Sequence, residues 1–176
     1  VALAKAGTEV YHAGAIGQDG MFLLDMLKDA GVHTEYVKVL DEVRTGNAII
    51  QNDKSGDNCI LLYGGANQAI TREQVDEVMS HFESGDYLVL QNEINDLPYI
   101  IDSAYAKGMK IILNPSPMDD QVLACDLSKI SMFILNEVEA AQILGKEDKG
   151  EESWEQIADD LLKKFPQATI VLTMGS

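Results

Sequence analysis

Short apolar runs alternate along this chain with longer stretches in which apolar residues recur at helical spacing. The apolar runs predict buried strands at residues 10–16, 35–40, 87–91, 110–114, 132–135 and 169–173. Amphipathic helices are predicted at residues 20–30, 97–107 and 137–144. Two capping-box sequences, Thr71-Arg-Glu-Gln74 and Ser153-Trp-Glu-Gln156, open further helices that run to about residues 82 and 165. This alternation predicts a parallel sheet with helices on its faces.

A β hairpin is predicted where this alternation is interrupted. Residues 45–52 and 58–63 are β-rich, and Asp53-Lys-Ser-Gly-Asp57 between them has the composition of a hairpin loop. We expect the hairpin to project as a small separate element that serves as a lid. The predicted fold class is therefore α/β, with a three-layer, mostly parallel sheet flanked by helices and a small projecting β lid.

The charge of the chain limits its partners. At 176 residues the chain has the length of one ordinary domain, and its formal net charge is -16. Because such a surface repels phosphate backbones and anionic lipid, we expect neither nucleic acid nor a membrane as partner. A small anionic substrate stays compatible with this charge if Mg²⁺ or backbone N–H groups offset it locally.

The cysteines and the apolar runs predict a cytoplasmic protein. Cys59 and Cys125 lie far apart and form no C-x-x-C pair, so we interpret both as reduced and mostly structural. No apolar run reaches the roughly 18 residues of a membrane span, and the first residues lack the pattern of a secretion signal. Residues 1–7 are typical of the last turns of a helix ending at Gly7, which predicts that further residues precede Val1.

Polar residues that directly follow predicted strands mark the candidate site, since open α/β sheets bind ligands beyond the carboxyl ends of their strands. Three motifs have this placement: Asn114-Pro115-Ser116-Pro117, Asn136-Glu137-Val138-Glu139 and Thr173-Met174-Gly175-Ser176. Glu93 also follows a strand. Its carboxylate is able to accept hydrogen bonds from ligand hydroxyls, or it simply solvates a loop.

The motif from Asn136 to Glu139 has two interpretations that share one geometry. Asn136 is a good N-cap, and a Glu at the third helical position reaches back to the N–H of the cap. Alternatively, the helix N-terminus presents N–H groups to phosphate while Glu139 holds a water on Mg²⁺. The residues alone favour plain capping.

Several other kinds of site are not indicated. His12, His33 and His81 show no metal-ligand spacing, which argues against a zinc site. The sequence contains no G-x-S-x-G turn, no G-x-x-x-x-G-K-[ST] loop and no G-x-G-x-x-G fingerprint.

Taken together and in this order, the motifs resemble the ribokinase family of ATP-dependent sugar kinases, which includes the phosphofructokinase-B-type enzymes. The resemblance runs over essentially the whole chain. Its Gln-x-Glu, Asn-Pro-x-Pro and Gly-Ala-Asn elements are more similar to the ribose-phosphorylating members than to fructokinases or adenosine kinases. The matching segments are Gly14-Ala-Ile-Gly17-Gln-Asp-Gly20, Gly31-Val32, Thr45-Gly46-Asn-Ala48, Gly56-Asp-Asn58, Gly65-Ala66-Asn67, Gln91-Asn-Glu93 and the three motifs given above.

The resemblance implies a role for each matching residue. It implies substrate binding by Glu93 and, on the lid, by Ala48 and Ile60, where lid strands touch the sugar and a dimer partner. Asn136 is implied to contact ATP, with Thr173, Gly175 and Ser176 opening the nucleotide-binding loop. Glu139 is implied to organise Mg²⁺ through water.

The function implied is ATP-dependent phosphorylation of D-ribose to D-ribose 5-phosphate, with Mg²⁺, and with K⁺ as a further ion of the intact enzyme. The partners implied are a small sugar, ATP and a second copy bound through the β lid. Residues 1–176 then form an incomplete domain that includes the lid hairpin at about 41–66.

The resemblance also implies that parts of the enzyme lie outside this sequence. The family's Gly-Gly-Lys-Gly-Ala-Asn-Gln-Ala motif is expected before Val1, and its Gly-Ala-Gly-Asp segment with the catalytic Asp is expected beyond Ser176. We therefore expect no catalytic residue in this chain and no measurable turnover by this fragment alone. Two alternatives stay open: a non-catalytic module that binds a sugar or nucleotide, and a module that dimerises through its lid.

Overall fold

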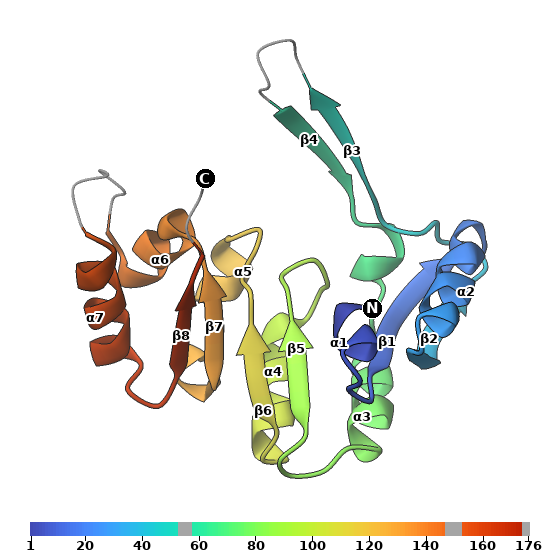
Figure 1. Ribbon diagram of the computed structural model, residues 1–176. Helices are drawn as coiled ribbons and strands as arrows, with labels where there is room; N and C mark the ends of the chain where they lie inside the picture. The colour runs from blue at the N-terminus through green and yellow to red at the C-terminus, as the bar shows by residue number, and fades with distance from the viewer. Residues whose placement is uncertain (53–57, 147–152, 174–176) are drawn as a thin grey trace. The chain divides into compact units, whose positions relative to one another are not determined.

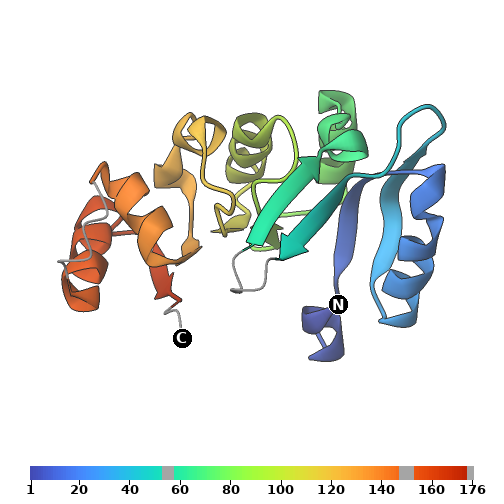
Figure 2. The same cartoon turned by 90° about the horizontal axis from the view of Figure 1, so that it is seen from above.

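The computed structural model describes residues 1–52, 58–146 and 153–173, and these divide into two compact units with the boundary between Gln74 and Val75 (Figure 1). The first unit begins with α1 (Ala2–Lys5), β1 (Tyr11–Gly17), α2 (Met21–Asp29) and β2 (His33–Leu40). Strands β1 and β2 pair in parallel, and α2, which connects them, packs against β2 (Figure 1 and Figure 2). The predicted strand, helix and strand order is confirmed here.

The hairpin follows as a two-stranded antiparallel sheet of its own. Its strands are β3 (Asn47–Asn52) and β4 (Asn58–Tyr63), with Ala48 opposite Leu62 and Ile50 opposite Ile60. The predicted loop at 53–57 lies outside the described residues. Every residue of β3 is exposed, so this strand of the hairpin carries no buried face.

The base of the hairpin is narrow, and glycine is required there. Gly65 has φ +48°, and a Cβ at this position would collide with the carbonyl oxygen of Arg44. The N–H of Ala66 donates to that same oxygen over 2.9 Å. The two ends of the hairpin are therefore held against each other by backbone contact.

The second unit is built on four parallel strands in the order β5-β6-β7-β8. The strands are β5 (Tyr87–Leu90), β6 (Lys110–Leu113), β7 (Met132–Leu135) and β8 (Thr169–Leu172). The helices are α3 (Arg72–Ser80), which crosses the boundary between the units, α4 (Leu97–Ala106), α5 (Asp120–Leu123), α6 (Glu137–Leu144) and α7 (Trp154–Lys164). Helix α4 packs on β6, and α7 packs on β8 and α6. The expected α/β fold, a parallel sheet flanked by helices, is confirmed.

The core of this unit lies against the sheet. Phe133 on β7 is fully buried and packs against Phe165, with 4.9 Å between the ring centroids. Both neighbouring strand positions that point the same way, Leu113 and Leu135, are also buried. Burial of such side chains stabilises the sheet by about 1.5–3 kcal/mol each.

Two helix starts follow the predicted capping, with one difference. Ser153 Oγ accepts from the N–H of Gln156, and Thr71 Oγ1 accepts from the N–H of Gln74. The side chain of Gln74, however, is buried and donates to the carbonyl oxygen of Gly14 on β1. Its amide thus joins the start of α3 to β1 within the first unit. Helix α5 was not predicted, although Asp119 is its N-cap.

Candidate functional site

The four strands of the second unit place their following residues at one edge of the sheet. Glu93, Asn114, Asn136 and Thr173 come after β5, β6, β7 and β8, which are parallel neighbours. Backbone hydrogen bonds continue past the strand ends, from Asn114 N–H to Leu90 O (2.9 Å) and from Thr173 N–H to Leu135 O (2.7 Å). The structure therefore brings Glu93, Asn136 and Thr173 to the carboxyl edge, where α/β sheets bind ligands.

Asn136 and Glu139 form a reciprocal capping box at the start of α6. Asn136 Oδ1 accepts from the N–H of Glu139 (2.9 Å), and Glu139 Oε2 accepts from the N–H of Asn136 (3.0 Å). Glu139 is buried. The predicted capping of this helix by Asn136 and Glu139 is thus confirmed. Since the capping bond uses Oε2 and a carboxylate has about four lone-pair sites, capping is compatible with holding a water on Oε1.

Thr173 lies beside this capping box at the end of β8. Its hydroxyl donates to Leu135 O over 3.1 Å, directly before Asn136 in the chain. Because the hydroxyl proton is used in this bond, the remaining hydrogen-bonding capacity of Thr173 Oγ1 is as an acceptor. Gly175 and Ser176, the other predicted nucleotide-binding residues, lie outside the described residues.

Glu93 occupies the loop between β5 and α4, and its side chain is exposed. The residue before it, Asn92, is buried and makes hydrogen bonds through its side-chain amide. Sequence reasoning did not single out Asn92, because a lone Asn in a loop has no distinguishing pattern.

Ala48 and Ile60 lie on the hairpin, in the first unit. Because opposed residues of an antiparallel pair share a face, the pairing puts Ala48, Ile50, Ile60 and Leu62 on one face. The other face carries Ile49 and Leu61, which lie opposite each other. Both faces are apolar and exposed, with Ile50 60% and Leu62 67% exposed.

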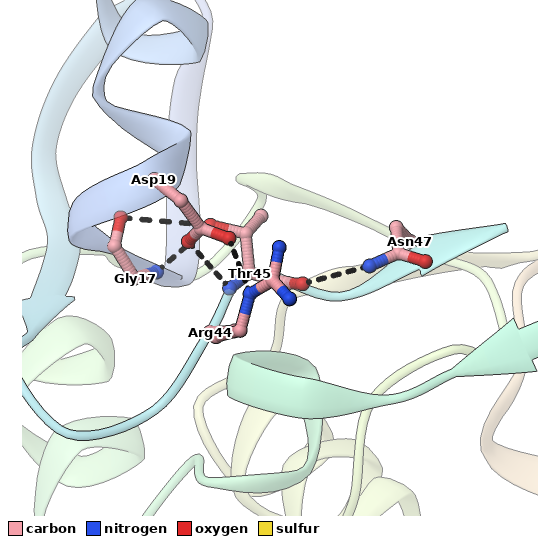
Figure 3. Close-up of polar contacts among 5 residues, drawn as sticks. All are labelled: Gly17, Asp19, Arg44, Thr45 and Asn47. Atoms are coloured by element: carbon pink, nitrogen blue, oxygen red, sulfur yellow. Dashed lines mark hydrogen bonds and ion pairs between the residues drawn. The ribbon is translucent and has the colours of Figure 1, made fainter.

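A polar cluster fixes the segment that leads into β3 (Figure 3). Asp19 Oδ1 accepts from both the N–H and the hydroxyl of Thr45, each over 2.9 Å, and its Oδ2 contacts Arg44 Nε over 3.2 Å. Thr45 Oγ1 accepts in turn from the N–H of Gly17 at the end of β1 (2.9 Å). The base of the hairpin is therefore tied to the first strand of its own unit.

The hydrogen bonds from Thr45, more than the exposed Arg44 guanidinium, hold the pKa of Asp19 below its ordinary value of 3.8. A lowered pKa in the folded state means that the Asp19 carboxylate stabilises the fold above pH 3.8. That contribution is lost as the pH falls through the lowered pKa.

Across 1–52, 58–146 and 153–173, no group of three or more His, Cys, Asp or Glu side chains is placed to hold a metal ion. Mg²⁺ typically uses one or two carboxylates together with water and substrate phosphates. Glu139 is a carboxylate of the kind that such a site uses.

Comparison with known proteins places the chain in a family. Residues 1–176 match the family described as pfkB family carbohydrate kinase. Ribokinase of Staphylococcus aureus (strain COL) is 32% identical over 99% of this chain and 58% of its own length. Ribokinase of Haemophilus influenzae is 30% identical over 100% of this chain and 58% of its own length. The chain thus spans 58% of the length of these relatives.

The structural comparison agrees. The crystal structure of ribokinase from Cryptococcus neoformans in complex with ADP is 28% identical and superimposes with a TM-score of 0.79, over 99% of this chain and 58% of the other. The fold is that of the ribokinase-like α/β proteins. The chain belongs to the pfkB family of carbohydrate kinases. No helix in the described part of the chain is long and apolar enough to cross a membrane.

We expect Thr45→Val to destabilise the protein by about 1–3 kcal/mol, because it leaves the buried N–H of Gly17 without its acceptor. Thr45→Ser keeps the hydroxyl and is the matched control. Urea denaturation of the two variants measures the difference. Equal midpoints for Thr45→Val and Thr45→Ser would show that the hydroxyl contributes nothing.

Proposed function

We propose that the full-length protein transfers the γ-phosphoryl group of ATP to the primary hydroxyl of ribose. The observation that carries the proposal is the arrangement of Glu93, Asn136 and Thr173 at the carboxyl edge of one parallel sheet. The names of the relatives support ribose as the acceptor, and the ADP in the Cryptococcus neoformans ribokinase supports the nucleotide.

Each residue has a proposed part in binding. Glu93 is proposed to accept hydrogen bonds from sugar hydroxyls, and Ala48 and Ile60 on the hairpin are proposed to contact the sugar. Asn136 and Thr173 contact the nucleotide from the ends of β7 and β8, together with Gly175 and Ser176. An ATP requirement also supports a cytoplasmic location.

The charge of the protein makes local compensation necessary. With a net charge of -16, the long-range field repels a triphosphate. The N-terminus of α6 offers backbone N–H groups and the positive end of a helix dipole beside Asn136. Mg²⁺, when bound, neutralises developing charge on the phosphoryl group. Glu139 is proposed to hold it through water, and K⁺ activation is a further part of the proposal.

The transfer itself depends on positioning. The acceptor hydroxyl must lie in line with the bond between the γ-phosphorus and the leaving oxygen, and a base must take its proton. Glu93 fixes the sugar, and Asn136 and Thr173 fix the nucleotide. The relatives are longer than this chain, and we assign the Asp base to residues beyond Ser176.

The decisive test is steady-state kinetics of the full-length protein with MgATP and ribose. We expect ADP release that depends on ribose, and a KM for ribose that rises about 10- to 100-fold in Glu93→Gln, because a hydrogen bond to a charged group contributes about 1.5–3 kcal/mol. The KM for MgATP serves as the internal control. Ribose binding without ADP release would instead indicate a non-catalytic binding protein.

Glu139→Gln separates capping from magnesium binding at the same position. A Gln at the third helical position still caps Asn136, so stability should be unchanged. Loss of the charge should weaken the apparent Mg²⁺ affinity about 10- to 100-fold, as for other residues outside the direct ligands. Mg²⁺ titration of the kinase rate at fixed ATP measures this. An unchanged titration with unchanged stability would leave Glu139 a capping residue only.

We also propose that the hairpin forms a homodimer contact. Its strands leave backbone edges and apolar side chains exposed, including Ile49 at 57% and Leu61 at 54%, which are opposite each other on one face. Such a surface favours pairing with a second copy.

Replacement of residues 47–63 by a short Gly-Ser linker should therefore abolish concentration-dependent dimerisation in sedimentation velocity. Leu61→Lys should weaken it without removing the hairpin. Tyr87→Lys, an exposed change on β5, is the control. A wild-type protein that stays monomeric at high concentration would refute the contact.

A further inference from the structure

A hydrogen-bond network centred on the buried side chain of Asn92 brackets Glu93. Asn92 donates from Nδ2 to Pro117 O (2.7 Å) and to Asp119 Oδ1 (2.8 Å), and its Oδ1 accepts from Gln121 Nε2 (2.8 Å). The same Gln121 nitrogen donates to Ile94 O over 3.0 Å. The residues on either side of Glu93 are therefore held by one side chain.

The network is itself held by the core of the second unit. Asp119 Oδ1 caps α5 by accepting from the N–H of Gln121 (2.9 Å) and of Val122 (3.2 Å). Val122 is fully buried. The position of the Gln121 side chain is thus set by a short helix that is fixed to the core, and the loop around Glu93 follows from it.

The donors and acceptors of the network allow only one orientation of each side-chain amide. Pro117 O and Asp119 Oδ1 are acceptors, so the Asn92 nitrogen must face them and its oxygen must face away. That oxygen and Ile94 O are both acceptors, so the Gln121 nitrogen must face both. A partly buried hydrogen-bond network in which each donor and acceptor has a fixed direction favours a single conformation of the loops that it joins.

We propose that Asn92, Asp119 and Gln121 are positioning residues for Glu93, and that they set the affinity for the sugar. This rests on the proposed sugar-binding role of Glu93. Glu93 is exposed on a loop, and the backbone that carries it determines where its carboxylate lies. A displacement of about 1 Å at a binding group is enough to cost about 10²-fold in rate. The network holds the backbone on both sides of Glu93 in place before the sugar arrives.

Gln121 gives the sharpest variants because it is half-buried and has no proposed contact with the sugar or the nucleotide. Gln121→Ala removes both donated bonds, and Gln121→Glu keeps the size but turns an acceptor toward Asn92 Oδ1 and Ile94 O. In the full-length protein, we expect both to raise the KM for ribose about 10-fold or more and to leave the KM for MgATP within about 2-fold. Asn92→Asp should act in the same direction.

Ser131→Ala is the matched control. Ser131 Oγ accepts from the N–H of Ile111 at the opposite edge of the same sheet (3.2 Å), so its loss costs a buried hydrogen bond away from Glu93. We expect Ser131→Ala to lower thermal stability and to leave the KM for ribose unchanged. If Ser131→Ala raises the KM for ribose as much as the Gln121 variants do, the effect follows from lost stability and the positioning role is overturned.

A double-mutant cycle with Glu93→Gln completes the test. If Gln121 acts through Glu93, Gln121→Ala should change the KM for ribose less than about 2-fold in the Glu93→Gln background. If Glu93→Gln raises this KM but the Gln121 variants do not, the network is structural only. The inference then fails, while the proposed role of Glu93 stands. If Glu93→Gln has no effect, the proposed role of Glu93 fails and the inference with it.

Discussion

The parallel pairing of β5, β6, β7 and β8 is the constraint on which the candidate site depends. Because all four strands run in one direction, the residue that follows each of them emerges at the same edge. Glu93 and Thr173 are thus brought to one edge although the whole βα succession lies between them in the sequence. Buried side chains such as Phe133 and Leu113 hold the strands in place from within. The candidate residues outside this edge belong to loops and helix starts, where binding residues are commonly found.

Structural and functional interpretations of one residue are not exclusive at this edge. Asn136 and Glu139 cap α6 through two reciprocal bonds, and this same geometry fixes a carboxylate at the start of the helix. Capping is therefore compatible with the binding roles proposed for the two residues. The cluster of Asp19 and Thr45 is comparable in the first unit, since its hydrogen bonds set the base of a hairpin that has no core of its own.

Much of the fold was predictable from the sequence because its signals are local. Apolar runs located the strands, and Ser153 and Asn136 identified helix starts through a spacing of three residues. The residues at the carboxyl edge followed from their place after those strands.

What could not be predicted depends on contacts between distant segments. Gln74 has the spacing of a capping residue, yet its side chain donates to Gly14. Asn92 and Gln121 are separated by a helix and a strand, so neither residue indicates the other in the sequence. The N-cap Asp119 before α5 was a local signal that sequence reasoning missed.

The hairpin has a consequence for how this protein tolerates change. With apolar side chains on both faces and none of β3 buried, β3 and β4 contribute little to the free energy of folding of the unit that carries them. Substitutions in those strands are then not limited by the need to fill a core, as they are at Phe133 or Val122. Substitutions among homologues should accordingly accumulate in the hairpin, where they alter its contacts with binding partners. The residues of the sheet should change more slowly, because they must keep the protein folded.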